Sequence, residues 1–442
     1  MPPGRSPKKE YGADRDDLNM MGASARDSTS MKTESISVRC CIVGGGPAGM
    51  MLGLLLARAG VGVMVLEKDA DFLRDFRGDT IHPSTLEVMH ELGLLDELLK
   101  LPHQKAERLE VQIGDMKLPL VDFTGLPVRC RFIAFMPQWD FLNFLAREGS
   151  RTPTFTLRMQ AEAVGLIEDS GRVVGVEARL PDGLLQVRAD LVVASDGRHS
   201  VLREKAGLEV IVLGAPMDVL WFRLSRRPGD PEQSMGRFDT GRIFVMINRG
   251  TYWQCGYVIP KQSYESIRER GLPAFRENVA ALAPFANDRV GELENWDEIK
   301  LLTVRVDRLR QWHRPGLLCI GDAAHAMSPI GGVGINLAIQ DAVAAANRLA
   351  VSLRENRLTD DHLHQVQRRR EFPTRVTQRL QVLVQNRVVA RVLESRERVA
   401  PPWPIRLMAR LPILRQIPAR LIGIGIRPEH VETANFRYTE SA

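Results

Sequence analysis

The chain has 442 residues, 44% of them hydrophobic, which is enough for two or three domains with a sizeable core. Its 60 basic and 54 acidic residues leave a net charge of +6, a small excess for this length, and no basic stripe carries interleaved aromatic residues, so nucleic-acid binding is not predicted. The five cysteines have neither the spacing of a zinc site nor that of a disulfide framework, which argues against a metal centre and favours the reducing cytoplasm.

Residues 1–36 are polar and have no apolar periodicity, so we expect a disordered N-terminal tail. This tail lacks the apolar core of a signal peptide, and it is too rich in acids for a mitochondrial presequence. The next run, from Cys40 to Ala57, has no charge and is long enough for a membrane span. Its glycines and Pro47 predict instead a strand, a tight turn and a buried helix.

The folded part opens with a βαβ unit: a strand over 37–43, a helix over 48–59 and a strand over 61–66. The turn Gly44-Gly45-Gly46-Pro47-Ala48-Gly49 has the spacing of a dinucleotide fingerprint, in which the first glycine allows the sharp turn, the next a close diphosphate and the last close helix packing. Glu67, at the end of the second strand, is placed to accept hydrogen bonds from ribose hydroxyls, which favours FAD or NAD over NADP.

The middle of the first domain has weaker signals. Leucine and methionine at three-residue spacing predict an amphipathic helix over 84–99, and a helix over 139–147 follows Gln138. Strands over 171–180 and 185–194 flank a turn and lead to Asp196-Gly197-Arg198-His199-Ser200 with Arg203. Asp196 either caps a helix that begins near His199 or serves a cofactor.

From about residue 210 to 303 the pattern changes to short strands broken by turns, at 219–224, 242–248 and 252–259. A strand over 317–320 then precedes Gly321-Asp322-Ala323-Ala324-His325. Pro329 and Gly332-Val333-Gly334-Ile335-Asn336 open a long helix over 334–353.

The C-terminal region, 355–442, is predicted to be helical. The pair His362 and His364 faces apart on a helix and cannot share a metal. Residues 405–426 mix leucines with arginines, and such a basic amphipathic segment either lies on a membrane surface or packs its apolar side on the domain.

We name residues 44–49, 196–203 and 321–336 the first, second and third motif. In this order and spacing the three motifs resemble the class A flavoprotein monooxygenases of the para-hydroxybenzoate hydroxylase type, which include ubiquinone-pathway hydroxylases and tetracycline-modifying monooxygenases. The resemblance covers about residues 38–353. It implies an α/β fold: a glutathione-reductase-type, Rossmann-like FAD-binding domain from residues 37–209 and 304–354, an inserted β-sheet substrate domain from 210–303, and the helical region 355–442.

The resemblance also implies a cofactor site. It predicts noncovalent FAD, with NADH or NADPH as a transient reductant because the chain has one glycine fingerprint only. Asp322 would bind ribityl hydroxyls, and the helix that begins at Gly334 would direct its N–H groups at the flavin pyrimidine. The predicted FAD-binding residues are Gly44, Gly46, Pro47, Ala48, Gly49, Glu67, Lys68, Arg77, Gln138, Ala163, Asp196, Gly197, Gly321, Asp322, Pro329, Gly332, Gly334 and Asn336.

In such a family NAD(P)H reduces FAD, and O₂ then forms a flavin 4a-hydroperoxide that hydroxylates an aromatic, quinone-like or polyketide-like substrate. The flavin carries this chemistry, so no catalytic side chain is assigned. The expected substrate pocket lies between flavin and β-insertion, where strand alternation places only half of the candidates on one face. These candidates are Trp221, Arg223, Phe244, Met246, Tyr252, Gln254 and Tyr257.

Three alternatives share the scaffold: a flavin-dependent halogenase, a geranylgeranyl-type reductase, and an escort-like protein that binds a lipidated partner without catalysis. The halogenase signature is not matched by the segment 252–260, and intact Glu67 and Asp322 argue against the escort protein. A monomer and a homodimer are both consistent with the sequence.

Overall fold

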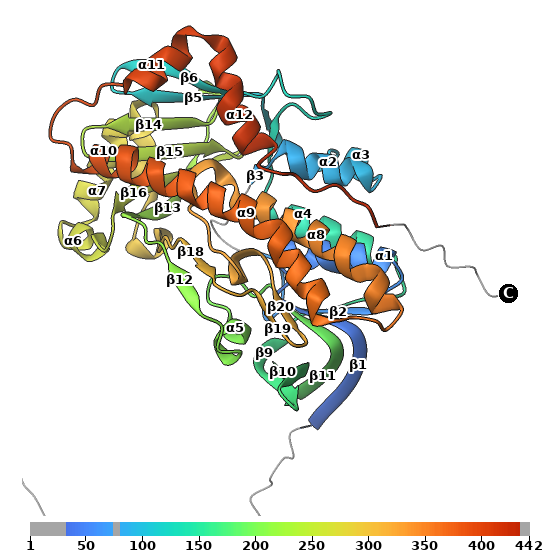
Figure 1. Ribbon diagram of the computed structural model, residues 1–442. Helices are drawn as coiled ribbons and strands as arrows, with labels where there is room; N and C mark the ends of the chain where they lie inside the picture. Colours follow the sequence, from blue (N-terminus) through green and yellow to red (C-terminus); the bar gives the residue numbers. More distant parts are fainter. Residues whose placement is uncertain (1–31, 74–79, 434–442) are drawn as a thin grey trace, which may run out of the picture.

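Figure 1 shows the computed structural model of the chain, which describes residues 32–73 and 80–433. Two β-sheets lie at opposite ends of the molecule, and the long helix α9 (Asp360–Val384) runs across from one towards the other. Mixed helices and strands with a helical C-terminal region confirm the predicted α/β class. Of the predicted tail, residues 1–31 lie outside the described part.

The first sheet has a parallel centre. Its parallel strands β20, β11, β1 and β2 are neighbours, and their carboxyl ends are aligned, since Val43 pairs with both Ala194 and Leu66. In spatial order the strands are β19 (His313–Arg314), β20 (Leu317–Cys319), β11 (Gly183–Ala194), β1 (Lys32–Val43), β2 (Val63–Leu66) and β8 (Phe155–Arg158), with an antiparallel branch of β10 (Arg172–Leu180) and β9 (Glu162–Asp169) next to β11.

Helices cover one face of this sheet. The uncharged run after Cys40 forms the end of β1, the turn and helix α1, in which residues 48–57 are all buried. No helix among the described residues is long and apolar enough to cross a membrane. The helices around this core are α1 (Pro47–Arg58), α2 (Pro83–Glu91), α3 (Leu95–Leu98), α4 (Gln138–Ser150) and α8 (Gly334–Arg354), and α5 (Val201–Lys205) lies beside β9.

The second sheet is larger than the predicted insertion. Its antiparallel centre comes from residues 217–260, as expected, but β14 also pairs in parallel with β5, a strand that precedes the insertion by about a hundred residues. The strand order is β17 (Lys300–Leu302), β13 (Met217–Ser225), β16 (Tyr252–Pro260), β15 (Arg242–Asn248), β14 (Met235–Asp239), β5 (Arg108–Ile113) and β6 (Met116–Asp122). Helices α6 (Tyr264–Glu269) and α7 (Leu272–Leu282) follow β16 in the chain.

Smaller elements join the two sheets. They are the three-stranded sheet β3 (Thr80–Ile81), β7 (Ile133–Phe135) and β4 (Gln104–Ala106), and the pair β12 (Val210–Val212) and β18 (Asp307–Leu309). The chain also has the 3₁₀ helices η1 (Pro284–Glu292), η2 (Trp296–Glu298), η3 (Gly321–Ala323), η4 (Ile330–Gly332) and η6 (Pro412–Arg415), and the π-helix η5 (Gln385–Val389). After α9, the chain continues through η5 into α10 (Ala390–Glu394) and ends its described part with α11 (Trp403–Arg410) and α12 (Gln416–Gly423).

Two predicted elements differ most from those in the structure. Strand β1 begins at Lys32 rather than residue 37, because its polar first half pairs with residues 183–188 of β11. The helix predicted over 84–99 is two helices, because Gly93 adopts a φ of 71° and its N–H bonds the carbonyl of His90, which ends α2.

Candidate active site

The three motifs converge at the carboxyl edge of the first sheet. They follow the adjacent strands β1, β11 and β20, whose last residues Val43, Ala194 and Cys319 are in register. Gly321 has no room for a side chain, since a Cβ there would lie 3.1 Å from Ala48 and 3.3 Å from Ala338. The first motif, the third motif and α8 therefore pack directly on one another.

The glycine turn has the geometry predicted for it. Gly44 has a φ of 102°, and a Cβ there would lie 2.4 Å from the carbonyl oxygen of Ser195, while a Cβ on Gly49 would meet the Gly44 carbonyl at 2.0 Å. Gly46 differs, because no atom of the described chain lies within 4 Å of its Cβ position. Since no side chain caps α1, open space at Gly46 meets available N–H groups at a helix start, an arrangement that suits a diphosphate.

Glu67 is held in place by the turn that it borders. One carboxylate oxygen accepts a hydrogen bond from Gly45 N–H at 2.9 Å, and the other accepts from Asp69 N–H at 3.1 Å. The side chain is buried at the end of β2. A carboxylate at the end of the second strand of a βαβ unit is the group that accepts hydrogen bonds from ribose hydroxyls in dinucleotide sites.

The second motif ties the site together mainly through Arg203. Its side chain is buried, and it donates to the carbonyls of Ala323 at 3.2 Å and Arg198 at 2.5 Å. The cap of α5 is shared: Ser200 accepts from Arg203 N–H at 3.1 Å, and Asp196 accepts from Leu202 N–H at 3.3 Å. The predicted cap was Asp196, whereas the structure has Ser200 as the N-cap residue and Asp196 as a second acceptor in the first turn. Burial raises the pKa of the Asp196 carboxyl.

Asp322 faces a partner that the sequence prediction did not include. Arg198 lies with Nη2 3.5 Å from Asp322 Oδ2, and both side chains are partly exposed, at 27% and 32%. Arg198 stands inside the second motif, so its position was a usable signal, but its pairing with Asp322 depends on the fold. The pair places one positive and one negative group beside the open space at the carboxyl edge.

The loop before α8 requires its glycines. Gly331 and Gly332 have φ values of 79° and 62°, and a Cβ on Gly332 would lie 2.4 Å from Thr80 Oγ1, which donates to the Gly332 carbonyl at 2.9 Å. Among the described residues, no side chain caps the start of α8 at Gly334. Its first N–H groups therefore remain available to a ligand.

Asn336 has an internal role that the sequence did not reveal. Its side-chain oxygen accepts from His82 N–H and Thr85 Oγ1, both at 2.8 Å, and its nitrogen donates to the Thr80 carbonyl at 3.1 Å. These bonds join the segment 80–85 to the start of α8. The side chain is therefore committed to hydrogen bonds within the protein, and its role in FAD binding stays a prediction.

A buried ionic cluster supports the third motif from behind. Asp341 accepts from Gly321 N–H at 3.1 Å, from His325 Nε2 at 2.6 Å and from Arg370 Nε at 3.0 Å, and Arg370 also binds Glu429 at 3.1 Å. Although burial opposes ionisation, His325 and Arg370 hold the pKa of Asp341 below its ordinary value. His325 is thus a packed structural histidine rather than an accessible base.

The remaining predicted cofactor residues are dispersed around this edge. Gln138 is buried at the first turn of α4, Ala163 is buried in β9, and Lys68 is exposed after β2. Gly197 has a φ of 86°, and no atom of the described residues lies within 4 Å of its Cβ position. Pro47 is the first residue of α1, and Pro329 directly precedes η4. Arg77 lies outside the described residues.

The predicted pocket residues divide between the two faces of the second sheet. Phe244, Met246 and Tyr257 pack with Phe275 and Val279 of α7, so only some of the candidates share one face of the sheet, as expected. The physical reason is strand alternation. The opposite face bears Trp221, Arg223, Tyr252 and Gln254.

Trp221 lies on the face that meets the third motif. It belongs to an apolar cluster that includes Ile330, and its ring covers Gly256, where a Cβ would lie 3.0 Å from the indole. Its indole N–H is buried without a hydrogen-bond partner among the described residues. Gln254 accepts from Arg249 at 3.0 Å, and Arg223 lies 5.0 Å from the Tyr252 ring centre.

The five cysteines and the described acids and histidines give no other reactive centre. All five thiols are free and buried, and burial raises the pKa of Cys41 to about 12. No group of three metal-binding side chains occurs in residues 32–73 and 80–433. The open space at Gly46 and Gly197, the uncapped helices α1 and α8, and the carboxylates Glu67 and Asp322 together fit an extended dinucleotide such as FAD.

Comparison with known proteins shows the family of the chain. The family described as an FAD binding domain matches residues 37–380. The 6-methylpretetramide 4-monooxygenase of Streptomyces rimosus is 33% identical over 407 residues, which cover 91% of this chain and 96% of that protein. Rifampicin monooxygenase of Streptomyces venezuelae is 30% identical over 336 residues, 71% of this chain and 64% of the relative.

Solved structures agree on the fold. The p-nitrophenol 4-monooxygenase of Pseudomonas putida superposes with a TM-score of 0.73 at 21% identity, over 89% of this chain and all of the other. The OxyS anhydrotetracycline hydroxylase of Streptomyces rimosus gives 0.69 at 21% identity, over 88% and 76%. Family, relatives and geometry lead to one conclusion: the chain belongs to the FAD-dependent aromatic monooxygenases of the para-hydroxybenzoate hydroxylase type.

Proposed function

We propose that this monooxygenase hydroxylates a polycyclic aromatic compound of the polyketide type. The observation that carries the proposal is the 33% identity with 6-methylpretetramide 4-monooxygenase across 91% of the chain, both domains included. The reaction balances as substrate C–H with O₂, NAD(P)H and a proton giving C–OH, water and NAD(P)⁺. FAD, when bound, supplies the redox chemistry.

The second sheet offers a surface that suits a planar substrate. A row of paired residues crosses five strands on the face of Trp221: Trp221, Gly256, Val245, Gly236 and Val111. Gly236 leaves open space in this row, because no atom of the described residues lies within 4 Å of its Cβ position, while the Trp221 ring covers Gly256. Val389 and Val392, from η5 and α10, pack with Ile243 and Val258 beside it. Fused aromatic rings stack favourably on such a strip.

The polar group that this strip offers to a substrate is the indole N–H of Trp221. Its unpartnered indole N–H is a donor, and a phenolic or carbonyl oxygen of the substrate would satisfy it. In the cofactor site, Gly46 and Gly197 leave room for the diphosphate, while Glu67 and Asp322 accept from ribose and ribityl hydroxyls. Arg198, paired with Asp322, orients that carboxylate.

The test is oxygen incorporation with a substrate panel. Purified enzyme with FAD and NAD(P)H is given simple phenols, quinone precursors and fused-ring polyketides under ¹⁸O₂, and oxygen uptake, NAD(P)H oxidation and product mass are measured. We expect one labelled oxygen atom in a fused-ring product. Label in simple phenols only would refute the polyketide class, and product without label would indicate the reductase alternative.

The variant Trp221→Phe probes the substrate face, with Tyr257→Phe on the α7 face as its matched control. Loss of one hydrogen bond to the substrate should weaken kcat/KM by roughly fivefold to tenfold, which corresponds to about 1 to 1.5 kcal/mol. The control should retain its kcat/KM. Equal effects in both variants would contradict the assignment of this face. If the enzyme formed a halogenated product in the presence of halide, the result would support the halogenase alternative and contradict hydroxylation.

A further inference from the structure

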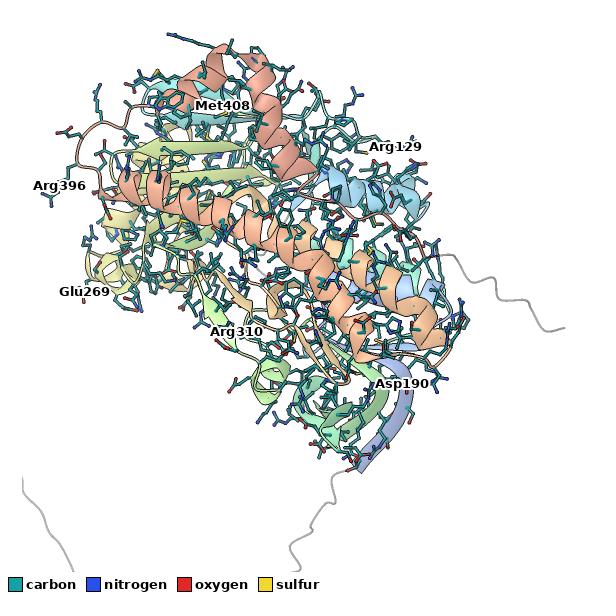
Figure 2. The ribbon with its side chains drawn as sticks, viewed as in Figure 1. Arg129, Asp190, Glu269, Arg310, Arg396 and Met408 are labelled. Carbon is teal, nitrogen blue, oxygen red and sulfur yellow. The ribbon has the colours of Figure 1, made fainter. Side chains whose placement is uncertain are left out.

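The last two helices display an apolar surface that the domain does not cover. We define the C-terminal face by six side chains, with exposed fractions from 40% to 75%: Trp403, Leu407, Leu411, Ile413, Ile417 and Leu421. No residue of α11 or η6 is buried. Figure 2 shows Met408, which marks α11, at the extreme end of the molecule.

This face is held in a fixed orientation. Helix α12 is anchored by its other side, where Ala419 packs in the cluster of Phe123 and Leu126 and a Cβ on Gly423 would lie 3.0 Å from Leu126. Arg415 joins α11 to the next turn, because it donates to the carbonyls of Met408 at 3.0 Å and Ala409 at 2.5 Å. The apolar side chains therefore point outward from a rigid base.

The charge on this segment has one sign only. Between Glu397 and Glu429 the sequence has no acidic residue, and it has the arginines Arg398, Arg406, Arg410, Arg415, Arg420 and Arg427. Arg406, Arg410 and Arg420 are exposed and alternate with the apolar side chains of the C-terminal face. An exposed tryptophan with leucines, isoleucines and arginines is the composition of a helix that lies in a lipid interface.

A second copy of the chain fits this face poorly. In a two-fold dimer the same patch meets itself, so the arginines of one copy would face those of the other with no carboxylate in the segment to pair with. An acidic protein would need a cavity to receive Trp403 and Ile413, which project at 75% and 66% exposure. A bilayer accepts projecting side chains without such a match.

We propose that the C-terminal face binds the surface of an anionic lipid bilayer. The apolar side chains enter the headgroup boundary, and the arginines contact the lipid phosphates. Helix α12 also contacts the start of α2, since the Ile422 carbonyl accepts from His82 Nδ1 at 2.8 Å. The bilayer would thus lie next to the FAD-binding region. The proposal does not depend on the substrate class above.

The experiment is sedimentation of the full FAD-loaded protein with vesicles of phosphatidylcholine, with and without phosphatidylglycerol. We expect binding to the anionic vesicles, weakened by salt, and little binding to the neutral ones. Arg406→Glu with Arg410→Glu, and separately Trp403→Ser with Ile413→Ser, should each reduce binding by at least about tenfold. The matched control is Lys205→Glu with Lys300→Glu, two exposed lysines, one on α5 and one on the sheet edge opposite β6.

Flavin absorbance and circular dichroism establish that each variant folds. Failure of the native protein to bind anionic vesicles would overturn the proposal, and so would equal binding by the control and the arginine variants. A dimer in lipid-free buffer that the Trp403→Ser, Ile413→Ser variant dissociates would assign the face to a second copy instead.

Discussion

Gly46 shows how a single residue can report on a ligand. It has an ordinary φ of −75°, and no atom of the described residues lies within 4 Å of its Cβ position, so none of them forbids a side chain there. Gly62 has the same freedom, but it precedes β2 away from the motifs. The two glycines therefore differ only in what approaches them from outside the protein.

Gly46→Val is expected to give a folded protein that retains little FAD, because the branched side chain fills the space for the diphosphate. Gly62→Val should keep its flavin. The released flavin is measured by absorbance after denaturation, together with the melting temperature of both apoproteins. A yellow Gly46→Val protein would show that the diphosphate lies elsewhere.

Arg370 illustrates a second kind of residue, one that acts on the site from behind. It is 1% exposed and neutralises Asp341, which in turn holds the Gly321 N–H. Removal of one partner from such a buried pair leaves an unpaired charge.

Arg370→Leu should lower the free energy of unfolding by about 3 to 5 kcal/mol. Arg375→Leu, on the same helix but in an exposed pair with Glu371, should change it by less than about 1 kcal/mol. Urea unfolding of both variants measures the difference. Similar values for the two would mean that the buried cluster does not stabilise the third motif.

At the level of elements, α12 is joined to α2 through one imidazole. His82 is fully buried at the start of α2 and donates through Nδ1 to the Ile422 carbonyl. Burial lowers its pKa to about 4, from an ordinary 6.5. The folded protein therefore holds His82 neutral at pH values where the unfolded chain protonates it.

This shift makes the contact dependent on pH. The stabilisation by neutral His82 is complete above pH 6.5 and is lost as the pH falls towards 4, because the unfolded state then binds the extra proton. Between pH 7.5 and 5 the native protein should lose about 2 kcal/mol more than His82→Gln. Urea unfolding at both pH values checks this, and identical losses would exclude His82 as the cause.

Local patterns were enough to predict several elements. The βαβ unit, the strands 242–248 and 252–259 and the helix from Gly334 followed from apolar runs and glycine turns, which act within a few residues. The parallel pairing of β5 with β14 could not be predicted, because the sequence of a strand does not specify which distant strand it pairs with. The hydrogen bonds of Asn336 and the pairing of Arg198 with Asp322 could not be predicted either, because they join residues that are far apart in the sequence.

The molecule as a whole should be stabilised by its cofactor. Residues 44–67, 196–203 and 321–336 carry most of the predicted FAD-binding residues and follow adjacent parallel strands, so we expect FAD to bind only when all three are in place. At a free FAD concentration one hundred times its Kd, the free energy of unfolding should rise by about 2.7 kcal/mol. Asp322→Ala should need more FAD for the same gain, because it removes an acceptor of ribityl hydroxyls.

Thermal unfolding with increasing FAD measures both proteins, with FMN as the comparison ligand. FMN lacks the adenosine that Glu67 is placed to bind, so it should stabilise less. An equal response to FAD and FMN would contradict the role of Glu67, and an unchanged midpoint in Asp322→Ala would contradict that of Asp322.

The ionic cluster behind the third motif also sets an order of events during synthesis. Glu429 pairs with Arg370, 59 residues earlier in the chain, and Arg370 holds Asp341 against the Gly321 N–H. Before Glu429 has left the ribosome, the nascent chain already contains every glycine motif. It still lacks Glu429, the last residue of the ionic cluster that supports the third motif. Cofactor loading is therefore expected to follow translation of residue 429 rather than accompany the emergence of the βαβ unit.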